Sequence, residues 1–142
     1  MKTALTKRTG VDTLIEAYRS HVLGRNLPNP ASVNFSSTRE IMVQPSGGLD
    51  LWSRLSGVLV WACTLTELTA TWTHTADDRL LVQVIGRTAG GTPITIYGGG
   101  TFDECCGLVP LALDEREGVS LDELYTLVSL LREHGQHERE VA

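Results

Sequence analysis

The sequence predicts an α+β domain in which helices cover an antiparallel sheet, with the element order α-ββ-α-βββ-α. Two observations lead to this fold class. Between residues 67 and 98, apolar and polar residues alternate with a period of two, and Asp77-Asp78 and Gly90-Gly91 interrupt the alternation. Such a pattern is typical of three strands joined by hairpins. Apolar residues also recur at helical spacing in two segments before this run and in one segment after it.

One domain is the simplest organisation for 142 residues, because a chain of this length can bury a sizeable core. Residues 1–10 and 136–142 are expected to be flexible ends of that single domain. The chain is 42% hydrophobic and 20% charged, which is ordinary for a globular protein.

The first half of the chain is predicted to hold a helix, a hairpin and a second helix. Asp12 can cap the first helix, which Gly24 and the prolines after it end. Residues 33–44 then form a short hairpin. The second helix has a wide apolar stripe and is expected to be largely buried, and Gly57 within it indicates close packing. The stripe consists of Leu49, Leu51, Trp52, Leu55, Val58, Leu59, Ala62 and Cys63.

The second half holds the three-strand run and a last helix. Pro93 cannot donate a hydrogen bond to a neighbouring strand, so the third strand of the run is expected at a sheet edge. The stretch from Gly98 to Pro110 is expected to be irregular, and Leu108 to Gly118 is expected to be a loop before the last helix. Ser120 and Glu123 have the capping-box spacing at the start of the last helix, and Gly135 is a natural end. The apolar face of this helix contains Leu121, Leu124, Tyr125, Val128 and Leu131.

Charge and cysteine content exclude several classes of protein. A net charge of -5 argues against a general nucleic-acid-binding surface. A local basic patch of Lys2, Lys7, Arg8 and Arg25 leaves a nucleic-acid-binding regulator as an alternative. No stretch approaches about 18 apolar residues, and the first residues lack the apolar core of a signal peptide, so we expect no membrane association. The three cysteines form a poor disulfide framework and suit a reducing cytoplasm, which is the expected location.

Cys105 and Cys106 are the candidate nucleophiles. Adjacent cysteines cannot easily bind one zinc ion together, and a catalytic thiol would need a nearby base such as His74 or His134. The simpler interpretation is that one cysteine is buried and the other packs under the loop. A small thiol-dependent enzyme that uses Cys105 or Cys106 is therefore an alternative function.

Two further motifs point to neither a cofactor nor a metal. Gly98-Gly99-Gly100 follows a strand, as phosphate-binding loops do, but no lysine next to a serine or threonine follows it. A flexible strand exit is the simpler interpretation. His134 and His137 have H-x-x-H spacing, but Gly135 is expected to break the helix between them, and no third ligand is evident.

Partner binding is the leading hypothesis for the function. Trp61 falls away from the apolar stripe of the second helix, so it is expected to be exposed and to anchor a partner protein. Leu124 and Val128 provide an alternative partner surface if the last helix does not dock on its own domain. We therefore predict a non-enzymatic accessory protein that binds another protein. Pairing of two copies to cover the sheet edges is also expected.

The run from Leu23 to Val33 leads from the first helix into a strand, and Trp61-Ala62 lie on the second helix. Together they resemble small uncharacterised proteins encoded by actinobacteria and their phages. The resemblance covers residues 11–98. It implies an accessory or phage-type protein that acts on a host or partner protein, and it assigns no role to any residue.

Overall fold

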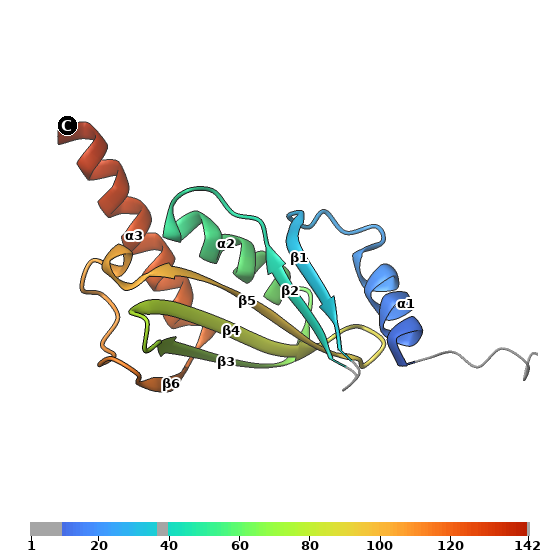
Figure 1. Ribbon diagram of the computed structural model, residues 1–142. Coiled ribbons are helices and arrows are strands. Elements are labelled where there is room, and N and C mark those ends of the chain that lie inside the picture. Colours follow the sequence, from blue (N-terminus) through green and yellow to red (C-terminus); the bar gives the residue numbers. More distant parts are fainter. Residues whose placement is uncertain (1–9, 37–39, 142) are drawn as a thin grey trace, which may run out of the picture.

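Six strands form one mixed sheet in the computed structural model, which describes residues 10–36 and 40–141, with side chains of the last helix described as far as Gln136. The helices are α1 (Gly10–Val22), α2 (Leu51–Ala62) and α3 (Leu121–Val141) (Figure 1). The strands are β1 (Pro30–Phe35), β2 (Ile41–Pro45), β3 (Thr66–His74), β4 (Arg79–Arg87), β5 (Pro93–Thr101) and β6 (Arg116–Val119), and a short 3-10 helix, η2 (Phe102–Cys105), follows β5.

The order of strands across the sheet is β1-β2-β5-β4-β3-β6. The predicted combination of helices and strands is present, but the prediction of an antiparallel sheet is wrong for one pair, because β2 and β5 are parallel. The reason is topological. Helix α2 returns the chain to the level at which β2 began, so β3 runs in the direction of β2. An odd number of hairpin-connected strands then gives β5 that same direction.

Strand β6 is the element that the sequence does not predict. Its four residues, Arg-Glu-Gly-Val, have no strand-like alternation of apolar residues. They are extended because they pair with Ala70–Thr73 at the free edge of β3. The predicted loop from Leu108 to Gly118 is therefore wrong at its end, and the irregular stretch predicted from Gly98 to Pro110 is wrong at its start, since β5 continues to Thr101.

The third strand of the three-strand run is β5, and its predicted position at a sheet edge is also wrong, because β5 lies between β2 and β4. Pro93 is tolerated there as the first residue of the strand, opposite Arg87. Gly98, near the other end of β5, makes room for α2. A Cβ atom on Gly98 would lie 2.9 Å from Cγ2 of Val58, so a side chain at this position would push the helix away.

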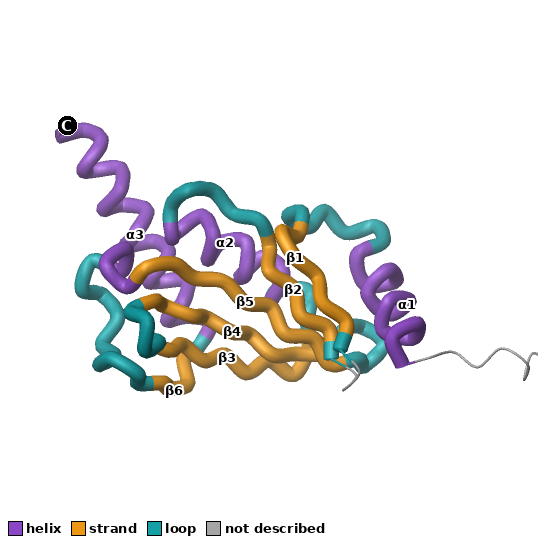
Figure 2. The backbone as a smooth tube through the Cα atoms, viewed as in Figure 1, coloured by secondary structure: helices purple, strands orange, loops and turns teal. Residues whose placement is uncertain are grey.

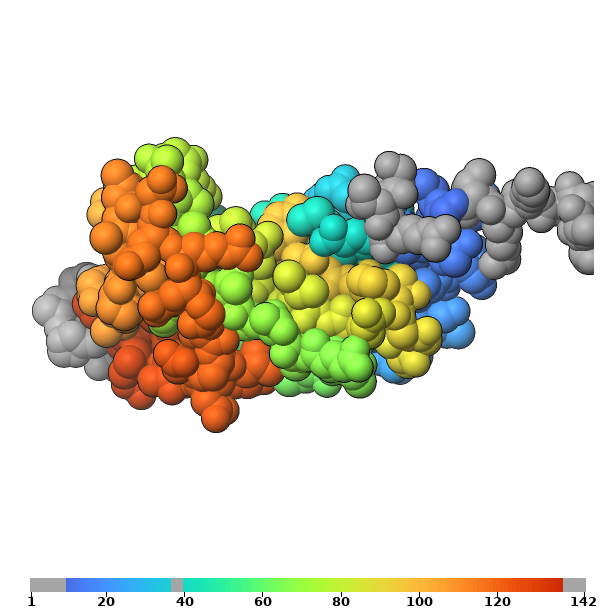
Figure 3. Space-filling view, turned by 90° about the horizontal axis from the view of Figure 1, so that it is seen from below, coloured from blue at the N-terminus to red at the C-terminus, as the bar shows by residue number. Residues whose placement is uncertain are grey.

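Helices α2 and α3 lie on the same face of the sheet, and α1 stands at the β1 end (Figures 1 and 2). Figure 3 shows the other face, on which atoms of β2, β5, β4 and β3 reach the surface. The predicted close packing at Gly57 is confirmed, because a Cβ atom there would lie 3.3 Å from Cβ of Pro45.

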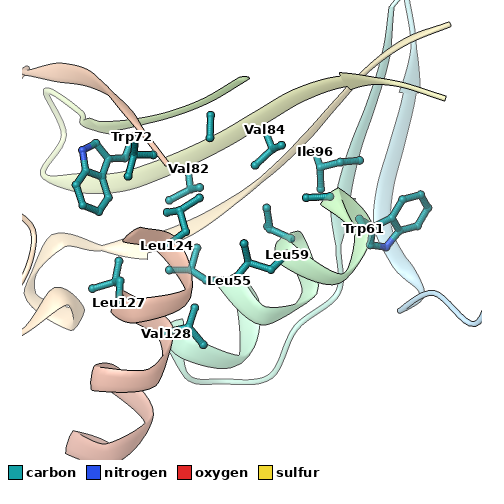
Figure 4. Close-up of a cluster of buried hydrophobic side chains, with 14 of the residues drawn as sticks. Leu55, Leu59, Trp61, Trp72, Val82, Val84, Ile96, Leu124, Leu127 and Val128 are labelled. Carbon is teal, nitrogen blue, oxygen red and sulfur yellow. The ribbon is translucent and has the colours of Figure 1, made fainter. Parts of the chain in front are cut away.

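The hydrophobic core fills the space between this sheet and the two helices (Figure 4). The capping box at the start of α3 is confirmed: the backbone N–H of Ser120 donates to Oε1 of Glu123 (3.1 Å), and the Glu123 N–H donates to Oγ of Ser120 (3.0 Å). Gly135 does not end the helix as predicted, since α3 continues to Val141. The core residues drawn in Figure 4 include Leu55, Leu59, Trp72, Val82, Val84, Ile96, Leu124, Leu127 and Val128.

Candidate interaction surface

Trp61 is not the exposed anchor that the sequence predicts. Its side chain is only 1% exposed, and its indole N–H donates to the carbonyl of Pro28 at 3.0 Å. Its ring stacks on Tyr18 of α1, with 6.2 Å between the ring centroids. The prediction failed because α2 has two packing surfaces. One meets the sheet and α3, and the end that carries Trp61 meets α1 and the connection after it.

Leu124 and Val128 are also buried within the chain, where α3 packs against α2 (Figure 4). They hold the last helix on its own domain, whereas Tyr125 of the same predicted face is 44% exposed. Together with the burial of Trp61, this leaves none of the three predicted partner-binding residues at the surface. A surface for a partner must be built from other residues.

The sheet face opposite α2 and α3 is one surface that the strands provide. Strand geometry sends alternate side chains to this face, and the pairing register places them in rows across the sheet. One row crosses from Met42 through Thr95 and Ile85 to Thr69. We call this surface the open face. It comprises Ser32, Asn34, Met42, Gln44, Thr69, Thr71, Thr73, Leu81, Gln83, Ile85, Thr95 and Tyr97.

None of these twelve residues is charged, but the same register places Arg79 and Arg87 at the two ends of β4, and Arg116 of β6, on this side of the sheet. Charged side chains lie at its margin, where Glu40 accepts a hydrogen bond from Thr95 Oγ1 at 2.7 Å and Arg87 pairs with Glu67 at 2.8 Å. Ile85 is 42% exposed within one of the rows. Absence of charge together with exposed apolar and aromatic side chains is typical of the centre of a protein interface.

A shallow depression of about 250 Å³ indents the open face beside Tyr97 and Leu81, and the charged residues Asp77 and Arg79 also line it. Gly99 contributes to it because this residue offers no side chain on that face. The surface is therefore not flat, and a side chain of a partner can enter it.

Both edges of the sheet resist the addition of another strand. The pairing of β1 is irregular between Pro30 and Ser32, and a proline has no N–H to donate. At the other edge, β6 has four residues and includes Arg116 and Glu117. Short, charged or proline-containing edges are the usual protection against edge pairing. The structural reason for expecting pairing through the edges is therefore weak, and the homodimer itself stays a prediction.

The three cysteines are free thiols in different surroundings. Cys105 is fully buried, and burial raises the pKa of its thiol to about 12. The predicted burial of one cysteine is thus confirmed, but Cys106 is exposed and does not pack under the loop. Cys106 lines a depression of about 220 Å³ together with His134 and Glu104. The structure therefore brings the second candidate thiol and one candidate base to the same depression.

His74, the other candidate base, is not part of this depression and is held by Asp78 and by the backbone of Leu111. The side chain of His137 and all of Lys2, Lys7 and Arg8 lie outside the described residues. Within the described part of the chain, no group of His, Cys, Asp and Glu side chains has the arrangement of a metal site.

Arg54 organises a polar cluster that sequence reasoning missed. Its Nε–H donates to the Gly99 carbonyl at 2.9 Å, and its guanidinium also forms an ion pair with Glu104. A third hydrogen bond, from Nη1, reaches the Leu49 carbonyl at 2.6 Å. These bonds connect α2 to the end of β5 and to η2. No sequence signal links an arginine in a helix to a carbonyl 45 residues away.

Among residues 10–36 and 40–141, no helix has both the length and the apolar character that crossing a membrane requires. Searches of family models, of curated proteins and of solved structures find no match to this chain. The resemblance to small proteins of actinobacteria and their phages stays a prediction.

Proposed function

We propose that this protein is a non-enzymatic accessory protein that binds a partner protein through the open face. The observation that carries the proposal is a sheet face that no helix of the described residues covers, with uncharged side chains along its middle and charged side chains at its ends. Strands β2, β5, β4 and β3 present this face as one rigid surface, since the helices on the opposite side hold them in place. A rigid surface loses little conformational entropy when it binds.

The composition of the open face favours a separate partner that binds reversibly. Hydroxyl and amide side chains outnumber the apolar ones, which are Met42, Leu81, Ile85 and Tyr97. Permanent homodimer interfaces are more apolar and resemble a domain core. A face of mixed polarity remains stable in water without its partner. The partner surface that fits is uncharged as well, because a buried charge without a counter-charge would be costly.

Introduction of a charge into the open face tests this proposal. Ile85→Lys places a cation in the row from Met42 to Thr69, and Leu49→Lys is the matched control because Leu49 is 96% exposed on a loop away from the face. A photo-crosslinking residue at position 85 should capture a partner from a lysate of the source cells. Excess unlabelled wild-type protein and the Leu49 variant should compete for that partner, and the Ile85 variant should not.

The proposal is wrong if the Ile85 variant competes as well as wild type while both variants retain the wild-type melting temperature. Crosslinking only between copies of this chain would identify the open face as a homodimer interface instead of a site for another protein.

A thiol-dependent enzyme is the second candidate function, because Cys106 and His134 line one depression. Cys106 would be the nucleophile and His134 the base. Protein binding is the better-supported function, since Glu104 in the same depression is already engaged by Arg54 and by Thr101. If Cys106 did not react with an iodoacetamide probe in the native protein, a thiol-dependent enzyme would be excluded.

A further inference from the structure

A groove runs between α3 and the chain segment that follows η2. It has a volume of about 380 Å³ and lies on the helix-covered side of the sheet, away from the open face. Most of its lining is apolar. The lining residues are Trp72, Leu108, Pro110, Asp122, Glu123, Thr126, Leu127 and Leu130.

The groove has a buried floor and exposed walls. Trp72 and Leu127 form the floor and are almost fully buried, so they belong to the core of the domain. The walls are different: Leu108 is 39% exposed and Leu130 is 42% exposed. Large apolar side chains that border a hollow and remain in water are a feature of binding grooves, because a ligand side chain can cover them.

Three carboxylates surround the apolar lining. Asp122 and Glu123 lie in the first turn of α3, and Glu117 accepts a hydrogen bond from the Trp72 indole N–H at 3.0 Å. None of them takes part in an ion pair among the described residues, and no lysine or arginine lines the groove. The rim therefore carries three carboxylates without an ion-pair partner among the described residues, two of them at the positive end of the α3 dipole.

We propose that this groove binds a peptide segment of a partner protein in which a bulky apolar side chain is flanked by lysine or arginine. The apolar side chain covers the floor formed by Trp72 and Leu127 and contacts the exposed wall leucines. The neighbouring cation meets the carboxylates of the rim, which gives the contact its charge specificity. This inference does not rest on the proposed function, because the groove and the open face share no residue.

Synthetic peptides provide the test. The probe is a short peptide of alternating leucine and lysine, and its comparison is the same peptide with glutamate in place of lysine. Binding is followed by NMR through the indole N–H resonance of Trp72, which lies in the groove. The lysine peptide should shift this resonance saturably, with weaker binding at higher salt, and the glutamate peptide should not shift it.

Variants locate the binding within the groove. Leu130→Ser and Asp122→Asn should each weaken binding of the lysine peptide several-fold. Thr126→Lys, at an exposed position of the lining, should abolish it. Leu49→Ser removes an exposed leucine elsewhere and should leave the affinity unchanged. Ile85→Lys should also leave it unchanged, which separates this test from that of the open face.

The inference is overturned if both peptides bind with equal affinity, if neither gives a saturable shift, or if Leu49→Ser weakens binding as much as Leu130→Ser does. It is also overturned if Thr126→Lys keeps a native NMR spectrum and full affinity. A shift of the Trp72 resonance with protein concentration alone would mean that a second copy of the chain occupies the groove instead of a basic partner peptide.

Discussion

His74 has an acceptor at each of its ring nitrogens. Nε2 lies 2.6 Å from Oδ1 of Asp78, and Nδ1 lies 3.1 Å from the Leu111 carbonyl oxygen. Only the protonated imidazole can donate to both oxygens. The hydrogen bond to Asp78 is the main reason why the pKa of His74 is raised above its ordinary value of 6.5. The ring also stacks on Phe102, with 3.4 Å between the centroids.

Because the folded-state pKa of His74 is raised, its contribution to stability is fully present below pH 6.5 and is lost as the pH rises through the raised value. We therefore expect His74→Gln to lower the free energy of unfolding at pH 6 more than at pH 8. Urea unfolding of both proteins at the two pH values measures this. An equal loss of unfolding free energy at pH 6 and at pH 8 would show that the charge of His74 does not matter. Asp78→Asn removes the partner of that charge, so it should also lower the unfolding free energy more at pH 6 than at pH 8.

His21 should behave in the opposite sense. The Thr64 hydroxyl donates to the Trp61 carbonyl at 2.7 Å, so it must accept from His21 Nε2 at 2.8 Å. Nε2 therefore carries the proton in the neutral form of the ring, and the buried Nδ1 has no hydrogen-bond partner among the described residues. Burial, followed by the charge of Arg25, lowers the pKa of His21.

A lowered pKa means that the contribution of His21 to stability is present above pH 6.5 and is lost as the pH falls below it. His21→Gln can keep the donor to Thr64 but cannot take up a proton. We expect its unfolding free energy to decline less than that of wild type between pH 7 and pH 5. A steeper decline in the variant would contradict the neutral state of His21. Circular dichroism during urea titration gives both values.

Thiol reactivity should separate the three cysteines in the native protein. Cys105 should resist labelling at neutral pH, because it is fully buried and its pKa is raised to about 12. Cys63 and Cys106 are exposed and should react. Iodoacetamide labelling followed by peptide mass spectrometry measures each site, and the same reaction in denaturant should label all three. Rapid native labelling of Cys105 would show that the segment around η2 opens readily.

At the scale of elements, local patterns in the sequence predict most of the structure. All three helices and five of the strands follow from spacing and turn residues. The alternation of Thr69, Thr71 and Thr73 with apolar neighbours also marks a sheet with two different faces. The predictions that fail concern features that depend on contacts between distant segments. Strand β6 exists because β3 offers a free edge, and Trp61 is buried because α1 folds over it.

The glycines of β5 show the same limit. In the sequence they suggest a flexible strand exit, whereas in the structure they are a place where α2 approaches the sheet closely. We expect Gly98→Ala to lower the unfolding free energy by about 1–3 kcal/mol, since its Cβ would lie 2.9 Å from Cγ2 of Val58. Gly90→Ala is the matched control, because its Cβ would have no neighbour within 4 Å. Chemical denaturation measures both.

Relief of the contact provides a second control for this experiment. Val58→Ala removes the methyl group that the new Cβ would meet, so it should recover part of the stability when combined with Gly98→Ala. Strictly additive effects of the two substitutions would mean that the glycine is needed for its backbone and not for close packing.

At the scale of the whole molecule, helices cover one side of the sheet, and the other side is the surface that we propose for binding. Helices α2 and α3 bury the apolar side, whereas Gln44, Thr69 and Ile85 stay exposed on the open face. The candidate surface could be predicted only in part. Alternation identifies the polar side of β3, but the sequence does not tell whether a helix covers that side. Trp61, which the sequence predicts to be exposed, lies under α1 instead.

Truncation of the last helix tests this division. Ending the chain after Gly118 removes the buried side chains of Leu124, Leu127 and Leu131, each of which contributes about 1.5–3 kcal/mol. A loss of that size approaches the total stability of a small domain, which is about 5–15 kcal/mol. We expect the truncated chain to be unfolded by circular dichroism. Ending the chain after Gln136 should leave the melting temperature unchanged, because the core residues of the described helix end at Leu131. If the chain ending at Gly118 kept a cooperative transition at the wild-type temperature, α3 would be an accessory element and its inner face would be a further surface for a partner.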